Sequence, residues 1–285
     1  MPVRRLALIV VLAMLAFAAN SLLCRLALKT TGIDAGSFTS LRLASGAAVL
    51  WLLVRWRGPA TPPGGSWLAA AALFIYAAGF SFAYLSLPTA VGALLLFGAV
   101  QMTMIGTGLW RGERLQALQT AGFVLALGGL LSLLAPGLGS APPPLSAALM
   151  LAAGVAWGVY SLLGKRLGNP TVATAGNFLR ALPFCLILSL AGLERINLDA
   201  AGVIYALASG GLASGLGYAL WYAALPALAA TTAASLQLSV PVLAALGGVL
   251  FLGEAISWQL LLSSLAILGG IGLVIGGKKR LPGAA

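Results

Sequence analysis

The feature that most constrains the fold is a run of 54 residues without a charged side chain, between Asp199 and Glu254. A helix needs about 20 apolar residues to cross a bilayer, so the run is too long for one membrane helix and long enough for two. Proline disfavours the helical conformation in the preceding residue and lacks an N–H. We therefore expect a turn at Leu225-Pro226, and Leu87-Pro88 in a second uncharged run predicts an equivalent turn.

The composition places such a chain in lipid. It is 61% hydrophobic and 7% charged, with a mean hydropathy of +1.05, whereas soluble domains carry about 25% charged residues. The chain has no histidine, which excludes imidazole metal sites and histidine proton relays. Cys24 and Cys185 lie in apolar segments, and we interpret both as buried hydrophobic residues.

Charges, glycines and prolines separate ten candidate membrane spans. These spans cover residues 6–28, 36–54, 66–87, 89–110, 117–135, 145–166, 171–192, 200–223, 227–252 and 257–276. With a cytoplasmic N-terminus, eleven Lys and Arg residues fall on the inner side and three on the outer side. This asymmetry predicts an inner-membrane protein with both termini cytoplasmic. The N-terminal stretch also has the features of a cleaved signal peptide.

The two halves of the chain repeat each other at nearly one spacing, which argues against cleavage of the first span. The matches are Ser21-Leu22-Leu23 with 161–163, Arg42 with Arg180, Tyr84…Pro88 with Tyr222…Pro226, Gly112-Glu113 with Gly253-Glu254, and Gly128-Gly129 with Gly269-Gly270. Each half has five spans, an odd number, so the halves insert in opposite orientations. We predict an all-α membrane protein with ten transmembrane helices in two inverted five-helix repeats, residues 1–137 and 138–285.

Aromatic and polar residues share helix faces in this arrangement. Residues at i, i+3 and i+4 lie on one face, which groups Phe17, Asn20 and Ser21; their repeat partners are Trp157, Tyr160 and Ser161. Further candidates in the third, eighth and ninth spans are Phe80, Tyr84, Tyr218, Trp221, Tyr222 and Gln237. Ligand pockets are mostly apolar and aromatic with a few placed polar groups. We therefore predict a substrate cavity lined by these residues.

Aromatic anchoring at the lipid–water interface is the alternative interpretation. We assign that role to the tryptophans at span ends, which are Trp51, Trp56, Trp67, Trp110 and Trp258. Pro183 and Pro241 lie inside predicted spans and predict kinks that could serve gating.

Four charged residues have two interpretations each. Arg42 and Arg180 lie inside spans, where an arginine can pair with a substrate carboxylate, or can snorkel to the interface or bond helix carbonyls. We favour the second interpretation for both. Glu113 and Glu254 could couple transport to protons, but each ends a span beside glycine, and we favour a cap or turn.

The chain resembles the EamA-type branch of the drug/metabolite transporter superfamily in its two five-helix halves, the arginine in the second span of each half, and Gly-Glu closing the fourth span. Its aromatic faces are most similar to those of YddG-type aromatic amino-acid exporters. It departs from the family where Ser263 replaces the glycine that Gly122 represents in the first half. The resemblance implies an exporter of small amino-acid-like solutes, aromatic and other apolar amino acids above all, working by alternating access.

Other functions stay open at this point. Export of other metabolites or drugs fits the same superfamily. A phosphate or nucleotide-sugar carrier would need several cavity cations. A channel or a non-transporting sensor needs no paired cavity faces, and an intramembrane enzyme would need a catalytic motif that the sequence lacks. We expect a small-molecule substrate and membrane lipid as partners, without nucleic acid, an obligate protein partner, a cofactor or a metal.

Overall fold

The computed structural model describes residues 2–56, 64–110, 112, 115–134, 141–164, 169–224, 227–228, 236–237 and 239–276. These residues form helices and connections only. The helices are α1 (Val3–Thr30), α2 (Ala35–Trp56), α3 (Trp67–Ala83), α4 (Thr89–Trp110), α5 (Ala117–Leu134), α6 (Pro144–Gly164), α7 (Pro170–Ala191), η1 (Leu193–Arg195), α8 (Ala200–Leu207), η2 (Ala208–Leu216), α9 (Gly217–Ala224), α11 (Ser239–Leu252) and α12 (Trp258–Gly276).

The helix boundaries follow the breakers in the sequence. Pro88 directly precedes α4, so the predicted turn at this proline is confirmed. Its counterpart Pro226 lies outside the described residues. Side chains cap the starts of further helices, because the first N–H groups of a helix lack partners; examples are Asp34 for α2, Ser66 for α3, Asn169 for α7 and Asp199 for α8.

The helices have the length and composition of membrane spans. Within the described residues, six helical segments are long and apolar enough to cross a bilayer, and four shorter apolar helices accompany them. The tryptophans expected at the lipid interface, Trp51, Trp56, Trp67, Trp110 and Trp258, are 47–90% exposed in the isolated chain. The fold is therefore that of an all-helical, multi-pass membrane protein.

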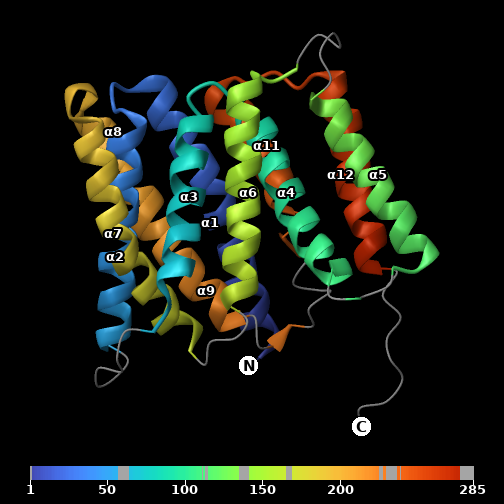
Figure 1. Cartoon of the computed structure of the whole chain (residues 1–285), viewed down its shortest axis with the longest axis horizontal. Helices are drawn as coiled ribbons and strands as arrows, with labels where there is room; N and C mark the ends of the chain where they lie inside the picture. The colour runs from blue at the N-terminus through green and yellow to red at the C-terminus, as the bar shows by residue number, and fades with distance from the viewer. Residues whose placement is uncertain are drawn as a thin grey trace.

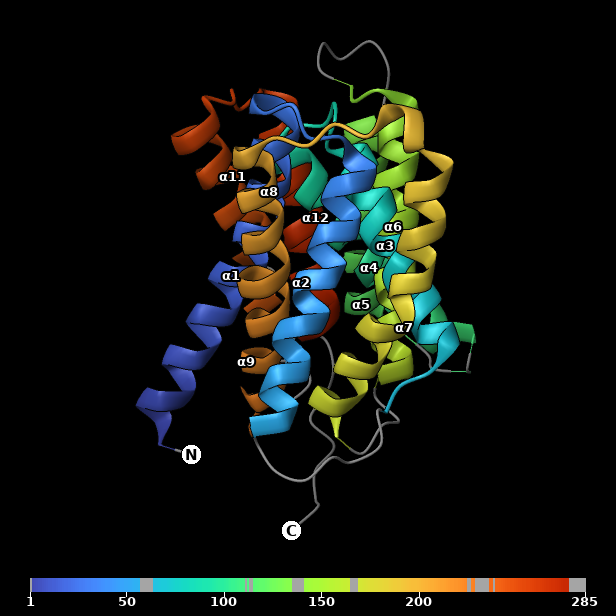
Figure 2. The same ribbon diagram turned by 90° about the vertical axis from the view of Figure 1, so that its left-hand side faces the viewer.

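Helices that are distant in sequence lie side by side (Figures 1 and 2). α2 packs on α7, α3 and α4 pack on α6, and α1 packs on η2, α9 and α11. α5 and α12 pack mainly on each other and lie together at the right of Figure 1. The core is at the centre of the bundle, where Thr89–Gln101 of α4 are buried without interruption.

The segment from α8 to α9 is helical throughout but changes its winding. Residues 208–216 form η2, a π-helical stretch in which Gly210, Gly211 and Gly215 are buried. A methyl group on Gly210 would overlap the carbonyl oxygen of Arg42, so α2 and η2 approach to backbone contact. Small residues permit such close packing in membranes, as the glycine-rich sequence predicts.

The two ends of the bundle are named by their distance from the N-terminus, which lies at the bottom of Figure 1. The distal end holds the α1–α2, α3–α4, α7–α8 and α11–α12 connections. There the Asp34 carboxylate accepts a hydrogen bond from Asn197 N at 3.0 Å, and that of Asp199 accepts one from Gly32 N at 3.1 Å. These bonds join the α1–α2 connection to the α7–α8 connection.

Candidate functional site

A small cavity lies among α1, α3, α4, α6, η2 and α9, at the centre of the bundle. Its lining residues are Phe17, Asn20, Ser21, Tyr76, Phe80, Leu96, Phe97, Trp157, Ala213, Ser214, Tyr218 and Gln237. Its volume is about 20 Å³, room for about one water molecule. The helices would have to separate before this cavity could admit a solute as large as an amino acid.

Aromatic rings in contact form one wall of the cavity. The ring centroid of Trp157 lies 4.7 Å from that of Tyr76 and 5.1 Å from that of Tyr218. Phe17 meets Tyr218 edge to face, at 5.8 Å between centroids. Aromatic pairs favour such offset and edge-to-face geometries. The wall therefore joins α1, α3, α6 and α9 through ring contacts.

A chain of hydrogen bonds runs along the cavity behind these rings. The Tyr76 hydroxyl oxygen accepts from Arg42 Nη2 at 2.9 Å and from Asn20 Nδ2 at 3.2 Å. Asn20 Oδ1 in turn accepts from Ser209 Oγ at 2.7 Å. The chain connects α2, α3, α1 and η2, so movement of any of these helices would change the polar face of the cavity.

The structure brings together seven of the predicted site residues. Phe17, Asn20, Ser21, Phe80, Trp157, Tyr218 and Gln237 all line the cavity. The remaining five lie nearby but do not line it. Tyr160 stacks on Trp157, Trp221 packs against Phe17, and Ser161 Oγ donates to the Trp157 carbonyl. Tyr222 is half-buried on α9.

Tyr84 lies one helical turn beyond the lining residue Phe80 and does not line the cavity itself. It is fully buried near the start of α4, where its ring packs on Gly92 and its hydroxyl donates to Thr89 O at 3.3 Å. Its place after the end of α3 carries it away from the cavity toward the distal end. The helical periodicity placed it with Phe80, and the two rings do meet edge to face at 4.7 Å between centroids, but Phe80 lines the cavity and Tyr84 does not.

Pro183 and Pro241, the two prolines predicted to kink their helices, both lie within helical segments. α7 remains one helix through Pro183. Pro241 lies near the start of α11, and Leu236 and Gln237 shortly before it are also helical. The residues just before α11 are only partly described, and gating by either proline stays a prediction.

Several lining residues were not among the predicted site residues. Leu96, Phe97 and Ala213 carry no polar signal, and a sequence full of such residues does not single them out. Ser214 belongs to the glycine-rich η2, and its hydroxyl lacks a hydrogen-bond partner within the described residues. Tyr76 could have been found from its position one turn before Phe80.

Arg42 contradicts the favoured interpretation of a side chain that snorkels to the interface. Its residue is 1% exposed, and its guanidinium lies 5.1 Å from the Tyr76 ring centroid and 4.8 Å from that of Phe80. Arg180 follows the expected pattern, since its Nη1 donates to the carbonyls of Gly64 at 2.6 Å and Gly176 at 3.1 Å.

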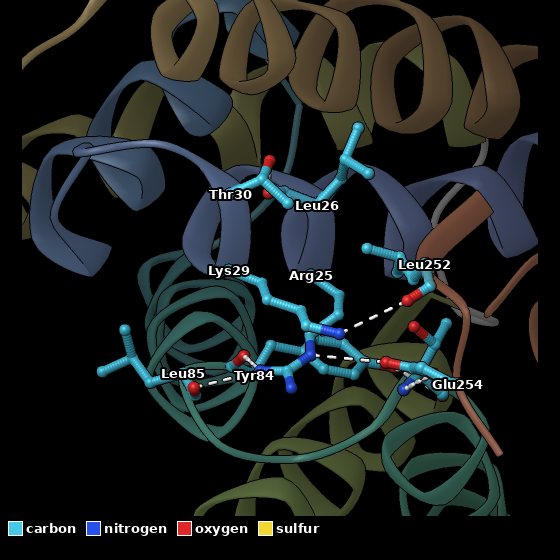
Figure 3. A network of polar contacts seen from close by, with 9 residues as sticks. Arg25, Leu26, Lys29, Thr30, Tyr84, Leu85, Leu252 and Glu254 are labelled. Carbon is cyan, nitrogen blue, oxygen red and sulfur yellow. Dashed lines mark hydrogen bonds and ion pairs between the residues drawn. The ribbon is translucent and has the colours of Figure 1, made fainter.

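A network around Arg25 lies one helical turn beyond the lining residue Ser21 on α1, toward the distal end (Figure 3). Arg25 Nη1 donates to the carbonyls of Tyr84 and Leu85 at 2.8 and 3.0 Å, and Nε lies 3.4 Å from Glu254 Oε1. The other Glu254 oxygen accepts from Thr89 N at 2.7 Å, the first residue of α4. Glu254 is therefore a cap, as expected, but it caps a helix from the other half of the chain. Glu113 lies outside the described residues.

The described residues offer little for catalysis or metal binding. No group of three or more His, Cys, Asp or Glu residues that could hold a metal occurs among them. Cys24 and Cys185 are buried free thiols there. The cavity lining offers aromatic rings, hydroxyls and amides, and the Arg42 guanidinium lies behind Tyr76 and Phe80.

Comparison with known proteins defines the class. The model of the EamA-like transporter family matches residues 144–276. The chain is 60% identical over 276 residues to the uncharacterized protein PA1977 of Pseudomonas aeruginosa, covering 96% of each chain. It is 34% identical over 116 residues to the threonine/homoserine exporter RhtA of Escherichia coli K12, covering 39% of this chain and 38% of RhtA.

One solved structure, described only as a crystal structure of a protein, shares the fold. Its TM-score is 0.65 at 22% identity, and the match covers 92% of this chain and 97% of that one.

This chain thus belongs to the EamA-like transporter family. The family assignment and the apolar helices together define a multi-pass membrane transporter of small molecules.

Proposed function

We propose that the protein exports small amino-acid-like solutes across the inner membrane by alternating access, with both termini in the cytoplasm. The observation that carries the proposal is the central cavity, which combines an aromatic wall with a few buried polar groups. Such a lining suits an apolar side chain next to a polar backbone group. The likeness to an amino-acid exporter supports the same substrate class.

The architecture that we propose is ten spans in two inverted repeats, residues 1–137 and 138–285. The packing of the helices supports it, because several contacts have a reciprocal partner when each helix is exchanged with its counterpart in the other half. Contact of α3 with α6 corresponds to contact of α1 with α9, and contact of α4 with α6 corresponds to contact of α1 with α11. Three further contacts join a helix to its own counterpart in the other half, so the exchange leaves them unchanged. They are α2 with α7, α4 with α11 and α5 with α12.

Alternating access is supported by the state of the distal end. Its network joins α1, the α3–α4 connection and the residues before α12, so it holds parts of both halves together at this end, while the cavity holds about one water molecule. Transport requires this network to open and re-form as the two halves rock about the site. In the proposed orientation the distal end faces the outside.

Transport by the purified protein tests this function. Vesicles containing the protein are loaded with unlabelled amino acid, and entry of the radiolabelled form is followed for L-threonine, L-homoserine, L-phenylalanine and L-tryptophan. We expect counterflow above that of protein-free vesicles for at least one of the four. Absence of counterflow for all four, with correctly folded protein in the vesicles, would contradict amino-acid export.

Two tryptophan variants make the test specific for the cavity. Trp157→Ala removes a ring from the cavity wall, whereas Trp258→Ala removes one that is 79% exposed on α12. An aromatic contact adds about 0.5–1.5 kcal/mol beyond burial, so Trp157→Ala should weaken apparent substrate affinity about three- to tenfold and Trp258→Ala should not. The reverse result would move the substrate site away from this cavity.

A further inference from the structure

Arg42 carries a buried charge that the described part of the chain leaves without a counter-ion. Its residue is 1% exposed, and its one hydrogen bond runs from Nη2 to the Tyr76 hydroxyl. Nε and Nη1 are buried and have no hydrogen-bond partner. The one ion pair among the described residues joins Arg25 to Glu254 and takes up that carboxylate.

Such a charge is costly unless an anion accompanies it. Burying an unpaired ion among apolar helices loses its hydration, and charged residues inside membrane spans therefore mark substrate or ion sites more often than packing sites. The rings of Tyr76 and Phe80 offset part of the cost through cation–π contact. They leave the donors on Nε and Nη1 unused, because a ring face accepts charge but replaces no in-plane hydrogen bond.

The position of Arg42 relates this charge to the cavity. Tyr76 and Phe80, the two rings against which the guanidinium lies, are both cavity residues on α3, and Arg42 itself is on α2. The Tyr76 hydroxyl further connects Arg42 to Asn20, another lining residue. A small displacement of α3 from α2 would therefore open the guanidinium to the cavity.

We propose that Arg42 binds the carboxylate of the transported solute through a fork made of the second Nη2 N–H and one of its unpaired neighbours, Nε or Nη1, so that the site selects solutes with one carboxylate beside an apolar or aromatic group. The planar guanidinium fork fits a carboxylate through two parallel hydrogen bonds. The aromatic wall around Trp157 takes the side chain, and the unpaired Ser214 hydroxyl lies on the same cavity. This inference rests on the proposed function and names the group that the site recognises.

A pair of ligands that differ in charge alone tests the proposal without any mutation. 3-Phenylpropanoate carries a ring and a carboxylate, and 3-phenylpropanamide replaces the carboxylate by a neutral amide of the same shape. Binding of each to the detergent-purified protein is measured by isothermal titration calorimetry. Since hydrogen bonds to a buried charge are the strong ones, we expect the carboxylate to bind about tenfold more tightly or better.

Variants then assign the preference to Arg42. Arg42→Gln should remove the preference by weakening carboxylate binding while amide binding stays within about twofold of wild type. Arg42→Lys keeps the positive charge but not the guanidinium fork, so it should retain part of the preference for the carboxylate. Arg55→Gln is the matched control, because Arg55 is an exposed residue near the end of the same helix. It should retain the full preference.

Three results would overturn the proposal: wild-type affinities for acid and amide within twofold of each other, no binding of either ligand, or an Arg42→Gln variant that keeps the wild-type preference. The outcome is separate from that of the counterflow assay. A carboxylate preference that depends on Arg42, together with no amino-acid counterflow, would contradict amino-acid export and leave the carboxylate site standing. Amino-acid counterflow without a carboxylate preference would support amino-acid export and contradict the carboxylate site at Arg42.

Discussion

Arg25 and Arg42 are both buried arginines in apolar helices, but their guanidinium groups differ in how many polar partners they have. Arg25 has a carboxylate and two carbonyl oxygens within hydrogen-bond range. Arg42 is more deeply buried, yet a single tyrosine hydroxyl and two ring faces are its partners among the described residues. A fully paired arginine holds helices together, whereas an incompletely paired one is available to a ligand.

The repeat counterpart of Arg42 sharpens this difference. Arg180 occupies the equivalent place in the second half of the sequence, but its guanidinium reaches the carbonyl of Gly64 at the start of α3 and that of Gly176 within its own helix. Equivalent positions in a repeat therefore need not share a role.

The largest effect should come from removing the paired charge. Arg25→Gln leaves Glu254 buried without its cation, and breaking a buried pair from one side costs about 3 kcal/mol or more. Arg42→Gln removes a charge that has no counter-ion among the described residues, so it should change the free energy of unfolding by less than about 1 kcal/mol. Thermal unfolding of the two variants in the same detergent measures the difference. Equal losses in both would mean that Arg42 is as much a structural residue as Arg25.

A smaller effect should follow at the repeat counterpart. Arg180→Gln removes hydrogen bonds from a charged group to two carbonyls, and we expect a loss of about 1.5 kcal/mol because the residue is only partly buried. Affinity for 3-phenylpropanoate should stay within about twofold of wild type, since these bonds lie outside the cavity. Thermal unfolding and calorimetry on one preparation report both quantities. A tenfold loss of affinity would assign the carboxylate to Arg180 as well.

The smallest effect should be one of pH on the helix that carries Arg42. The Asp34 carboxylate begins α2 by accepting from Ser37 N at 2.9 Å. Partial burial opposes its ionisation, but hydrogen bonds from Ser37, Asn197 and Gly36 outweigh this and lower its pKa below the ordinary 3.8. The α7 helix of Arg180 begins instead at the neutral Asn169.

A carboxyl group whose pKa is lowered by folding stabilises the folded state above its ordinary pKa, and that contribution disappears as the pH falls below it. Unfolding temperature should therefore decline on acidification below the ordinary pKa of 3.8. The decline should be smaller in Asp34→Asn, and it should remain in part because Gly32 and Gly202 lower the pKa of Asp199 in the same way. An Asn169→Ala variant should keep the wild-type pH profile while losing stability at every pH. An Asp34→Asn profile identical to wild type would show that this cap does not titrate in the range.

Much of the fold could be predicted because lipid leaves few alternatives. A backbone in hydrocarbon must satisfy its own hydrogen bonds, so apolar stretches of the right length become helices wherever they occur. Pro88 ends up directly before α4, and the span-end tryptophans face outward, for reasons that are local in sequence. Six cavity residues followed from helical periodicity and the repeat, because both describe which face a side chain occupies, and Gln237 followed from its polar side chain inside an apolar span.

The sequence by itself determined the class of protein, the approximate spans and the faces on which aromatic residues gather. It could not determine that Arg42 points inward, because an arginine eight residues into its helix can also snorkel to the interface, which is the interpretation that the sequence favoured. Only the tertiary structure decided this, through the backbone contact of α2 with Gly210 and the rings that α3 places beside the guanidinium. Periodicity fixes which side of a helix a residue is on. Which residues contact that side of the helix depends on packing between helices far apart in the chain.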